Sequence, residues 1–481
     1  MNRRMILYLV GQILRIEALF MLPALAISLY LREQSAIVGL GVSIALTLAA
    51  GLLALLAKPR DKSFHAKEGF VIVGLAWIVV SLFGALPFFL SGEIPDFMGS
   101  LFEAVSGFTT TGASVLANVE AMPKGLVYWR SFTHWLGGMG VLVFLLAIVP
   151  LSRGTGNAIF LLRAESTGPQ VDKLVPRMRR TAEILYAIYV GMTLLQIVLM
   201  LAGGVPLFDS ITLTFGTAGT GGFAIKNTSM ADYSAYAQVV VTVFMALFGV
   251  SFNIYYLLLI RSFRTAFKNE ELYTYFGIMA LFTLFITLDI RPLFAHGGEA
   301  LRHAAFQVSS IMTTTGFSTA DFNLWPQFSR MLLVVLMVLG ACAGSTGGGI
   351  KIARVLILLK AARNAVSQAV KPNTVRLTRL NGNALDQDTI HGTHVFMTLY
   401  AVIAVTSMLA LSFNGFSVDT NATAVLACLN NIGPGLDDVG PMGNYGAFSP
   451  LGKLILIFNM LIGRLEIIPM FTLFAPSVWK R

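Results

Sequence analysis

The segment FEAVSGFTTTG, residues 102–112, recurs later in the chain as FQVSSIMTTTG, residues 306–316. Both copies keep a phenylalanine, a serine, three threonines and a closing glycine at the same spacing. Two other loops are related to them, GTGGF at residues 219–223 and NNIGPG at residues 430–435. The four loops follow one another at intervals of about a hundred residues, which indicates duplication of one structural unit.

The chain around these loops is strongly apolar. Of its 481 residues, 56% are hydrophobic and 12% are charged, and the mean hydropathy is +0.75. Soluble domains carry about 25% charged residues, so the sequence predicts an all-α membrane protein. A transmembrane helix needs about 20 apolar residues, and ten segments meet this requirement. They are 6–31, 36–57, 69–91, 126–150, 181–203, 235–260, 272–290, 329–359, 392–413 and 451–475.

Each glycine loop follows a segment too short to cross a membrane, and these short segments lie near 97–108, 207–218, 300–312 and 419–429. Their length suits re-entrant helices. We therefore expect four units of helix, pore loop and helix around one central pore, preceded by two extra helices. The expected divisions are 1–67 for the two-helix extension and 68–152, 153–269, 270–380 and 381–481 for the four repeats, the third with an interrupted second helix.

The distribution of basic residues predicts the orientation. With the N-terminus inside, the loops 58–67, 153–180, 261–268 and 351–379 and the two termini hold 24 of the 34 Lys and Arg residues. This bias satisfies the positive-inside rule and places both termini in the cytoplasm. The first helix also fits a cleaved signal peptide at Ala24–Ala26, but Arg15 and Glu17 interrupt its apolar run, and a retained helix is favoured.

Backbone outside a helix is tolerated at membrane depth only where it is buried in protein or lines a watery cavity. Four equivalent loops can turn carbonyl oxygens inward and replace the hydration shell of an ion. Glycine adopts the φ angles that this requires, and the C-terminus of each short helix adds partial negative charge. None of the four motifs contains Asp or Glu, which argues against a divalent cation. Four outer acids either concentrate cations at the mouth or are solvated loop charges: Asp209, Asp321, Asp437 and Asp438.

The loops at Thr109–Ser114, Thr220–Phe223, Thr313–Ser318 and Asn430–Gly435 resemble those of the Trk/Ktr/HKT superfamily of potassium transporters. The resemblance runs nearly the whole chain, and the two extra helices favour the bacterial Trk membrane subunit, the TrkH type. It implies a K⁺ selectivity filter whose backbone carbonyls hold the ion. The filter residues would be Thr110, Thr111, Gly112, Thr220, Gly221, Gly222, Thr314, Thr315, Gly316, Asn431, Ile432 and Gly433.

Some details of the loops set the expected selectivity. In this superfamily a serine at the first filter glycine is associated with sodium selectivity, and glycine at all four positions implies potassium. Ala113 departs from the aromatic residue found at Phe223 and Phe317, and the fourth loop uses asparagine in place of threonine. We therefore expect the four walls of the pore to be unequal.

The predicted span 329–359 contains the sequence GSTGGGIK at residues 344–351. Three adjacent glycines are poor helix formers, so the helix should break here at membrane depth. The resemblance implies that this segment is the gate, and the alternative is a close helix crossing that needs small residues. The candidate gate residues are Gly344, Ser345, Thr346, Gly347, Gly348, Gly349 and Lys351.

Arg464 lies inside the last predicted span. A charge at the bilayer centre costs at least about 2.5–3.5 kcal/mol, so Arg464 should face the pore or a partner. The resemblance implies a pore arginine below the filter, and a structural pair with Glu466 is the alternative. His391 and His394 lie three residues apart, but a metal site would need a third ligand.

The function expected is potassium uptake across the bacterial inner membrane, with a K⁺/Na⁺ pathway or an ion-coupled symporter as alternatives. The resemblance implies a homodimer and a separate cytosolic nucleotide-binding regulator of the TrkA type. No organic cofactor site and no nucleic-acid partner is expected in this chain. An enzyme is disfavoured because no paired carboxylates or Ser/His pair occurs within the spans, and an inverted-repeat carrier is disfavoured because the four repeats share one orientation.

Overall fold

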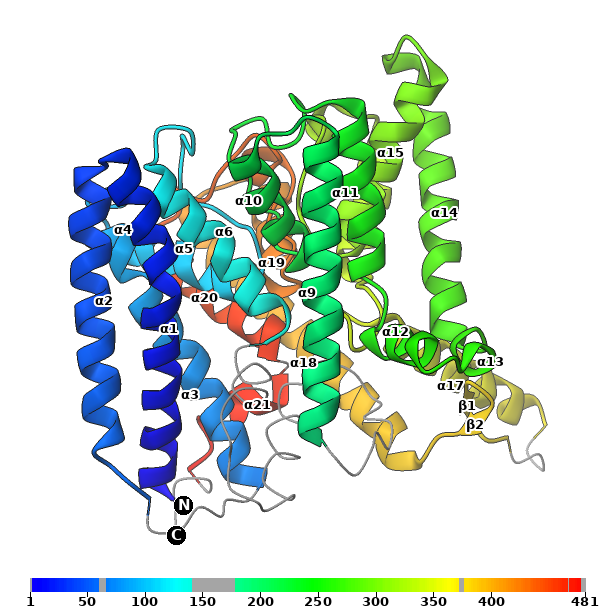
Figure 1. Ribbon diagram of the computed structural model, residues 1–481. Helices are drawn as coiled ribbons and strands as arrows, with labels where there is room; N and C mark the ends of the chain where they lie inside the picture. Colours follow the sequence, from blue (N-terminus) through cyan, green and yellow to red (C-terminus); the bar gives the residue numbers. More distant parts are fainter. Residues whose placement is uncertain (1, 60–65, 141–177, 372–375, 466, 477–481) are drawn as a thin grey trace.

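Helices make up nearly all of the regular structure in this computed structural model, which describes residues 2–59, 66–140, 178–371, 376–465 and 467–476. Figure 1 shows long helices standing side by side, with both termini at the same end of the molecule. The long helices are α1 (Arg3–Leu31), α2 (Gln34–Leu55), α3 (Ala66–Gly84), α9 (Met178–Ala202), α14 (Glu270–Ile290) and α18 (Gln387–Leu411).

Four shorter helices precede the glycine loops and lie away from the terminal end (Figure 1). They are α5 (Phe97–Phe108), α10 (Leu207–Ala218), α15 (Gly297–Met312) and α19 (Val418–Leu429). The helices that follow the loops are α6 (Lys124–Gly138), α11 (Ala235–Phe248), α16 (Gln327–Val338) and α20 (Pro450–Leu465).

The remaining elements are short or connect the others. They are α4 (Leu86–Leu90), α12 (Phe252–Leu259), α13 (Phe263–Ala266), α17 (Ile352–Val370), α21 (Ile467–Thr472), the strands β1 (Arg379–Leu380) and β2 (Asn383–Ala384), and the 3₁₀ turns η1 (Arg291–Leu293), η2 (Phe322–Leu324), η3 (Ser412–Asn414) and η4 (Asp437–Val439). The two strands pair antiparallel across Asn381–Gly382.

By length and apolarity, six helices of the described part can cross a membrane, or seven if the bent pair α11 and α12 counts as one span. The span predicted at 235–260 is therefore wrong as a single helix, because α11 and α12 meet at 87°. The chain turns at Gly249, where a Cβ atom would lie 2.4 Å from the Tyr275 hydroxyl. The predicted span 126–150 is described only as far as Gly140.

The short helices begin where a side chain caps their free backbone N–H groups. Asp96 accepts hydrogen bonds from the N–H groups of Met98 and Gly99 at the start of α5, and Ser417 accepts one from Thr420 at the start of α19. Such caps stabilise a helix by about 1 kcal/mol, so the starts of these two helices are encoded locally.

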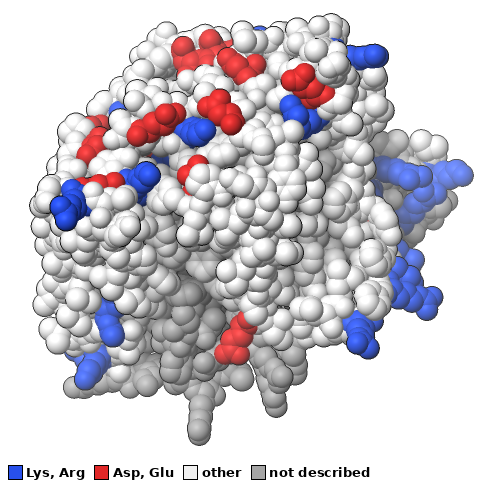
Figure 2. Space-filling view, turned by 45° about the horizontal axis from the view of Figure 1, so that its top comes forward, with Lys and Arg blue, Asp and Glu red and all other residues white. Residues whose placement is uncertain are grey.

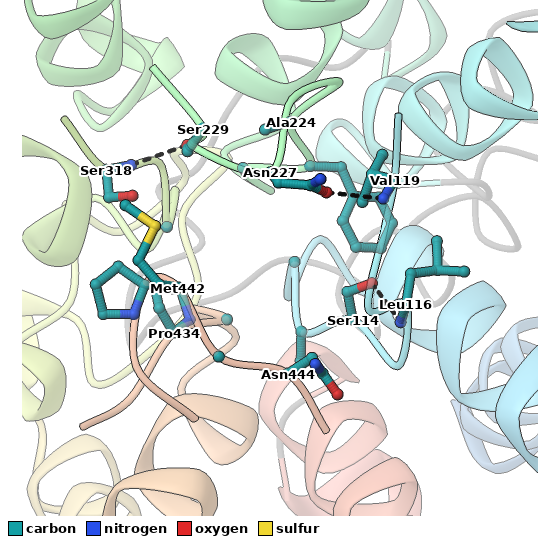
Figure 3. Close-up of a pocket in the computed structure, with 18 of the residues that line it drawn as sticks. Ser114, Leu116, Val119, Ala224, Asn227, Ser229, Ser318, Pro434, Met442 and Asn444 are labelled. Carbon is teal, nitrogen blue, oxygen red and sulfur yellow. Dashed lines mark hydrogen bonds between the residues drawn. The ribbon is translucent and has the colours of Figure 1, made fainter. Parts of the chain in front are cut away.

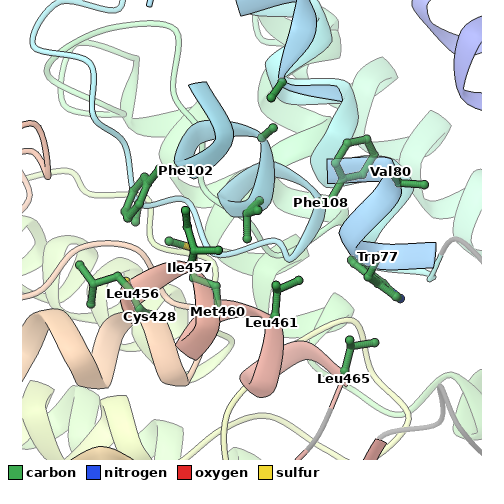
Figure 4. Packing of buried hydrophobic residues seen from close by; sticks show 14 of the residues in the cluster. Trp77, Val80, Phe102, Phe108, Cys428, Leu456, Ile457, Met460, Leu461 and Leu465 are labelled. Atoms are coloured by element: carbon green, nitrogen blue, oxygen red, sulfur yellow. The ribbon is translucent and has the colours of Figure 1, made fainter. Parts of the chain in front are cut away.

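Buried apolar side chains hold the short helices against their neighbours. Figure 4 shows α20 packed against α3, α5 and α19. Met460 and Leu456 lie on α20, Phe102 of α5 faces this helix, and Phe108 at the end of α5 lies beside Val80 of α3. Each of these five side chains is at most 2% exposed. Removing such a side chain leaves a cavity that costs about 2–5 kcal/mol, so this packing fixes where the short helix ends.

Candidate ion-conducting site

The four short helices end in the same way. The third residue after each helix donates its backbone N–H at 2.8 Å to the carbonyl five residues earlier, and these donors are Thr111, Gly221, Thr315 and Ile432. The last turn of each helix is thereby closed onto the loop. The C-terminal end of a helix carries about half a negative charge, and each of these ends therefore adds to the negative potential of its loop.

The loops also share their backbone angles. The residue two positions before the conserved glycine is left-handed, with φ of 54° at Thr110 and Thr220, 57° at Thr314 and 55° at Asn431. The glycines are left-handed too, with φ of 80° at Gly112, 75° at Gly222, 86° at Gly316 and 99° at Gly433. A threonine or asparagine in this region is uncommon, so its presence in all four loops marks a conformation that the surrounding structure imposes.

Each conserved glycine lies directly against a carbonyl oxygen of the next loop. A Cβ atom on Gly112 would lie 1.9 Å from the Gly221 oxygen, and one on Gly222 would lie 1.9 Å from the Thr315 oxygen. The remaining two contacts are Gly316 with Ile432, at 2.1 Å, and Gly433 with Thr111, at 2.7 Å. These contacts run from the first loop to the second, third and fourth and back to the first, so the four loops form a closed ring. No side chain fits at Gly112, Gly222 or Gly316 without moving a backbone carbonyl.

All four glycines line one cavity of about 120 Å³, which Figure 3 shows between the loops. Pro434 of the fourth loop and Met442 of the segment after η4 line it on one side, and Ser114 and Asn444 line it on another. Within the described residues the lining contains no carboxylate. Two cations, Arg130 and Lys226, and two amides, Asn227 and Asn444, also line the cavity. The four glycines themselves present only backbone groups, which are the ligands that potassium-channel filters use for a monovalent cation.

Side chains tie the walls unequally. The Thr109 and Thr111 hydroxyls lie 2.8 Å apart in the first loop, and Thr313 and Thr315 repeat this contact at 2.8 Å in the third. The fourth loop instead uses Asn431, whose amide donates to the Thr111 hydroxyl at 2.9 Å. The asparagine that departs from the repeat therefore joins the fourth loop to the first.

The segment between α16 and α17 folds back on itself beneath the ring. α16 ends at Val338, α17 begins at Ile352, and the Gly340 N–H donates to the Ile350 carbonyl at 2.8 Å. Its tip touches the undersides of the third and fourth glycine loops. In the third loop, the Gly348 N–H donates to the Thr314 hydroxyl at 2.6 Å. A Cβ atom on Gly348 would also lie 2.6 Å from the Asn430 carbonyl.

The same segment is held from its sides. Thr346 donates to the Phe248 carbonyl at 3.2 Å, and the Lys351 ammonium binds the Gly347 and Gly348 carbonyls, the second at 3.0 Å. Glu271 of α14 accepts the N–H groups of Ala343 at 2.7 Å and Ala353 at 3.0 Å. This buried carboxylate therefore joins the first half of the folded-back segment to the start of α17.

Arg464 joins the segment to the opposite wall. Its guanidinium donates to the Thr346 carbonyl at 2.8 Å, to the Gly138 carbonyl at 2.7 Å and to the Gly137 carbonyl. The side chain is 9% exposed. One cation thus spans from the end of α6 to the fold-back. Glu466, the alternative partner, lies outside the described residues.

The family model of TrkH, described as cation transport protein, matches residues 39–295 and 282–481.

This chain belongs to the TrkH family.

It is a multi-pass membrane protein of that family, and its relatives are transporters. It is 35% identical over 441 residues to the Trk system potassium uptake protein TrkH of Salmonella typhimurium, which covers 90% of each chain. It is 32% identical to the protein of the same name from Halomonas elongata, over all of both chains. The crystal structure of the potassium transporter TrkH from Vibrio parahaemolyticus matches all of both chains with a TM-score of 0.89 and 30% identity.

A buried ion pair behind the first two loops of this TrkH-family chain was missed by the sequence analysis. Arg130 Nε lies 2.6 Å from Glu103 Oε1, with side chains 3% and 0% exposed. Glu103 also accepts the Val115 N–H at 3.0 Å, and Arg130 donates to the Ala224 carbonyl at 3.0 Å while lying 3.5 Å from the centre of the Phe223 ring. The pair therefore connects the exits of two loops. Charged residues within the predicted segments 97–108 and 126–150 were the signal.

All four outer acids have hydrogen-bonding partners, and the Asp438 carboxylate accepts from the Thr420 hydroxyl at 3.5 Å. Asp209 accepts a hydrogen bond from the Tyr233 hydroxyl at 2.8 Å, and Asp321 accepts the Asn323 N–H at 3.0 Å. Hydrogen bonds from the Ser417 and Thr420 hydroxyls lower the pKa of the Asp437 carboxyl below its ordinary value. Figure 2 shows acidic side chains spread over the face opposite the termini.

The two cysteines and the two histidines His391 and His394 form neither a disulfide nor a metal site among the described residues. Cys342 and Cys428 are buried and free. Among the described residues, no group of three His, Cys, Asp or Glu side chains could hold a metal ion, and this includes the surroundings of His391 and His394.

Proposed function

We propose that this chain takes up potassium ions through a gated pore whose selectivity filter is the ring of Gly112, Gly222, Gly316 and Gly433. The observation that carries the proposal is the closed order of glycine-to-carbonyl contacts among four loops with one backbone conformation. The equivalent carbonyls belong to Thr111, Gly221, Thr315 and Ile432, and Thr110, Thr220, Thr314 and Asn431 complete the filter. The names of the TrkH relatives, which are potassium uptake proteins, support K⁺ as the ion.

The proposed architecture is four pore repeats, 68–152, 153–269, 270–380 and 381–481, after a two-helix extension at 1–67. About ten transmembrane segments then place both termini in the cytoplasm of a bacterial cell, with the protein in the inner membrane. The common end of both termini in Figure 1 supports this orientation, and so does the bias of Lys and Arg toward the predicted cytoplasmic loops.

The fold-back at residues 339–351 is proposed as the gate, in the closed position. Its tip contacts filter loops three and four from below, and Arg464 holds it to the end of α6. The guanidinium also repels a cation leaving the filter. Opening requires the fold-back to move away from Thr314 and Asn430 and to release Arg464.

The membrane potential is sufficient to drive uptake. Moving one elementary charge through 100 mV is worth about 2.3 kcal/mol, and about 1.4 kcal/mol corresponds to a tenfold concentration ratio. A conducting pore therefore sustains a K⁺ gradient of roughly fifty-fold without coupled chemistry. An ion-coupled symporter and a K⁺/Na⁺ pathway remain the competing functions.

Control is proposed to come from partners. A cytosolic nucleotide-binding subunit of the TrkA type would act on the gate through α17, which continues from the fold-back and is tied to α14 by the Lys360–Glu270 ion pair. A homodimer of this chain in the lipid bilayer is proposed as well. The Trk system names of the relatives support association with other Trk components.

Purified protein in liposomes tests the proposal. Vesicles loaded with K⁺ and diluted into K⁺-free buffer should take up a tracer cation, and external K⁺ should compete far better than Na⁺. Flux should persist with no pH gradient and no Na⁺ present. Flux that needs H⁺ or Na⁺ would favour the symporter, and equal competition by Na⁺ would contradict the proposed filter.

A further inference from the structure

A polar cavity lies at the terminal end of the molecule, beside the bend between α11 and α12. Its volume is about 580 Å³, and it is lined by α12, α13 and the turn between β1 and β2. Two cations, Arg264 and Lys268, line it together with the amides of Asn253, Asn381 and Asn383. No Asp or Glu is among its described lining residues. The cavity is therefore electropositive and rich in amide groups.

The two cations have no acidic partner in the described part of the chain. The nearest acidic residue in the sequence, Glu270, is already paired with Lys360 of α17, and its backbone N–H donates to Asn381 at 2.8 Å. The Oδ1 atom of Asn253 is buried and receives no hydrogen bond from any described residue. The cavity thus offers two free positive charges and one buried acceptor without a donor.

An apolar surface borders this cavity. Leu259 is 64% exposed, Ile260 54%, Phe263 54% and Phe267 55%. These side chains lie on α12, α13 and their flanks, and α12 leaves the direction of α11 at 87° (Figure 1). A bent helix with exposed large apolar residues and interspersed Arg and Lys is typical of a segment lying in the membrane interface. Figure 2 shows Lys and Arg side chains on the flank where α13 and α17 lie.

We propose that this cavity binds the headgroup of an anionic glycerophospholipid. Its phosphate lies between Arg264 and Lys268, a headgroup hydroxyl donates to Asn253, and its acyl chains cover Phe263 and Phe267. Phosphatidylglycerol has this combination of one negative charge and hydroxyl donors. A free phosphate ion would satisfy the cations and leave the apolar border uncovered.

The position gives the lipid access to the fold-back. Ser251 lines the cavity, and its hydroxyl lies 3.3 Å from the position of a Cβ atom on Gly344. The next residue, Phe252, donates its N–H to the Gly344 carbonyl at 2.9 Å. A lipid bound in the cavity therefore restrains Ser251 and Phe252, which contact the fold-back at Gly344. This consequence rests on the proposed gate, whereas lipid binding does not.

Lipid binding is measured on the full chain in detergent micelles, where no continuous anionic surface exists. Dioleoylphosphatidylglycerol is titrated, and both the thermal unfolding midpoint and the number of lipids retained in native mass spectrometry are recorded. Each Lys or Arg contributes roughly fivefold to the attraction of an anionic lipid, so Arg264→Gln/Lys268→Gln should weaken binding about 25-fold. The matched control Arg363→Gln/Arg376→Gln removes the same charge from exposed positions outside the cavity and should bind like the unmodified chain.

Two further arms separate the possible ligands. Dioleoylphosphatidylcholine should not protect the protein, and inorganic phosphate should neither protect it nor compete. Protection by phosphate equal to that by phosphatidylglycerol would overturn the lipid assignment in favour of a small-anion site. Equal affinity in the Arg264/Lys268 variant and the control would overturn the site itself. Asn253→Ala provides a second, charge-neutral variant, and its expected effect is a loss of preference for phosphatidylglycerol over phosphatidic acid.

Discussion

Single residues in this protein act mainly through backbone carbonyls. Arg464 binds three carbonyls at once, and the Asn431 amide bridges two loops. The residue types were readable from the sequence, because a charge in an apolar span and a glycine in a repeated loop are both unusual. The partners of these residues could not be predicted. Thr346 and Gly137 lie 118 and 327 residues from Arg464 in the sequence, and only the tertiary fold brings them together.

Arg464 combines a charge with a forked hydrogen-bonding geometry, and two substitutions separate these properties. Arg464→Ala removes both, so open probability and single-channel conductance should rise. Arg464→Lys keeps the charge but cannot span the Gly138 and Thr346 carbonyls, so open probability should rise while conductance stays near its original value. Single-channel recording measures both quantities. Unchanged open probability in both variants would remove Arg464 from the gate.

We expect the Glu103–Arg130 pair to stabilise the folded protein and also to maintain its K⁺/Na⁺ selectivity. Removing one member leaves a buried charge without its partner, which costs about 3–5 kcal/mol. We expect Glu103→Gln and Arg130→Met each to lower the free energy of unfolding by this amount, and the double variant to lose less than the sum. The K⁺/Na⁺ ratio should fall in the single variants, because Val115 and Ala224 lose their fixed positions.

Denaturant unfolding in detergent measures the free energy of unfolding, and bi-ionic potentials measure the K⁺/Na⁺ ratio. Additive losses would mean that the two residues act independently. An unaltered K⁺/Na⁺ ratio in a folded single variant would mean that the pair serves stability only.

At the scale of elements, the sequence predicted most helices within a few residues. The predicted segments 97–108 and 207–218 coincide with α5 and α10, because their lengths and the turn residues after them are local properties. The break between α11 and α12 was not predicted. It depends on Gly249 meeting Tyr275 and on Phe252 binding the Gly344 carbonyl, both of which are tertiary contacts.

The fold-back is an element whose removal should open the pore. Deleting residues 345–349 removes the contacts with Thr314, Phe248 and Arg464, while Gly340 and Ile350 still close the base of the fold-back. We expect K⁺ flux in liposomes without any regulator to rise about tenfold or more, which corresponds to losing about 1.4 kcal/mol of closed-state stabilisation. A deletion variant that also carries Gly112→Ser should conduct with reduced selectivity, which shows that the extra flux uses the same filter. Flux at the original level would contradict the gate.

At the scale of the whole molecule, the four loops meet although their sequences are spread over more than three hundred residues. Sequence repetition predicted that they are equivalent, but it could not predict that each glycine touches a carbonyl of the next loop. That arrangement depends on how the helices of four units pack around one axis. If this ring is the proposed filter, its selectivity is a joint property of all four loops.

An ion that binds only the folded ring should stabilise the whole protein. At a concentration one hundred times its dissociation constant, a ligand of this kind adds about 2.7 kcal/mol to the free energy of unfolding. We expect the thermal unfolding midpoint in detergent to rise with added KCl and to rise less with NaCl at equal ionic strength. The same shift with both salts would indicate a general salt effect.

The glycine ring is tested most directly by replacing its members one at a time with serine. The variants Gly112→Ser, Gly222→Ser, Gly316→Ser and Gly433→Ser are compared with Gly191→Ser, at a position where a Cβ atom has no neighbour within 4 Å. The measurement is the reversal potential with K⁺ on one side of the bilayer and Na⁺ on the other. Each ring variant should lose K⁺/Na⁺ discrimination, and the Gly191 variant should keep it. Unaltered reversal potentials in all four ring variants would contradict the assignment of these loops as the filter.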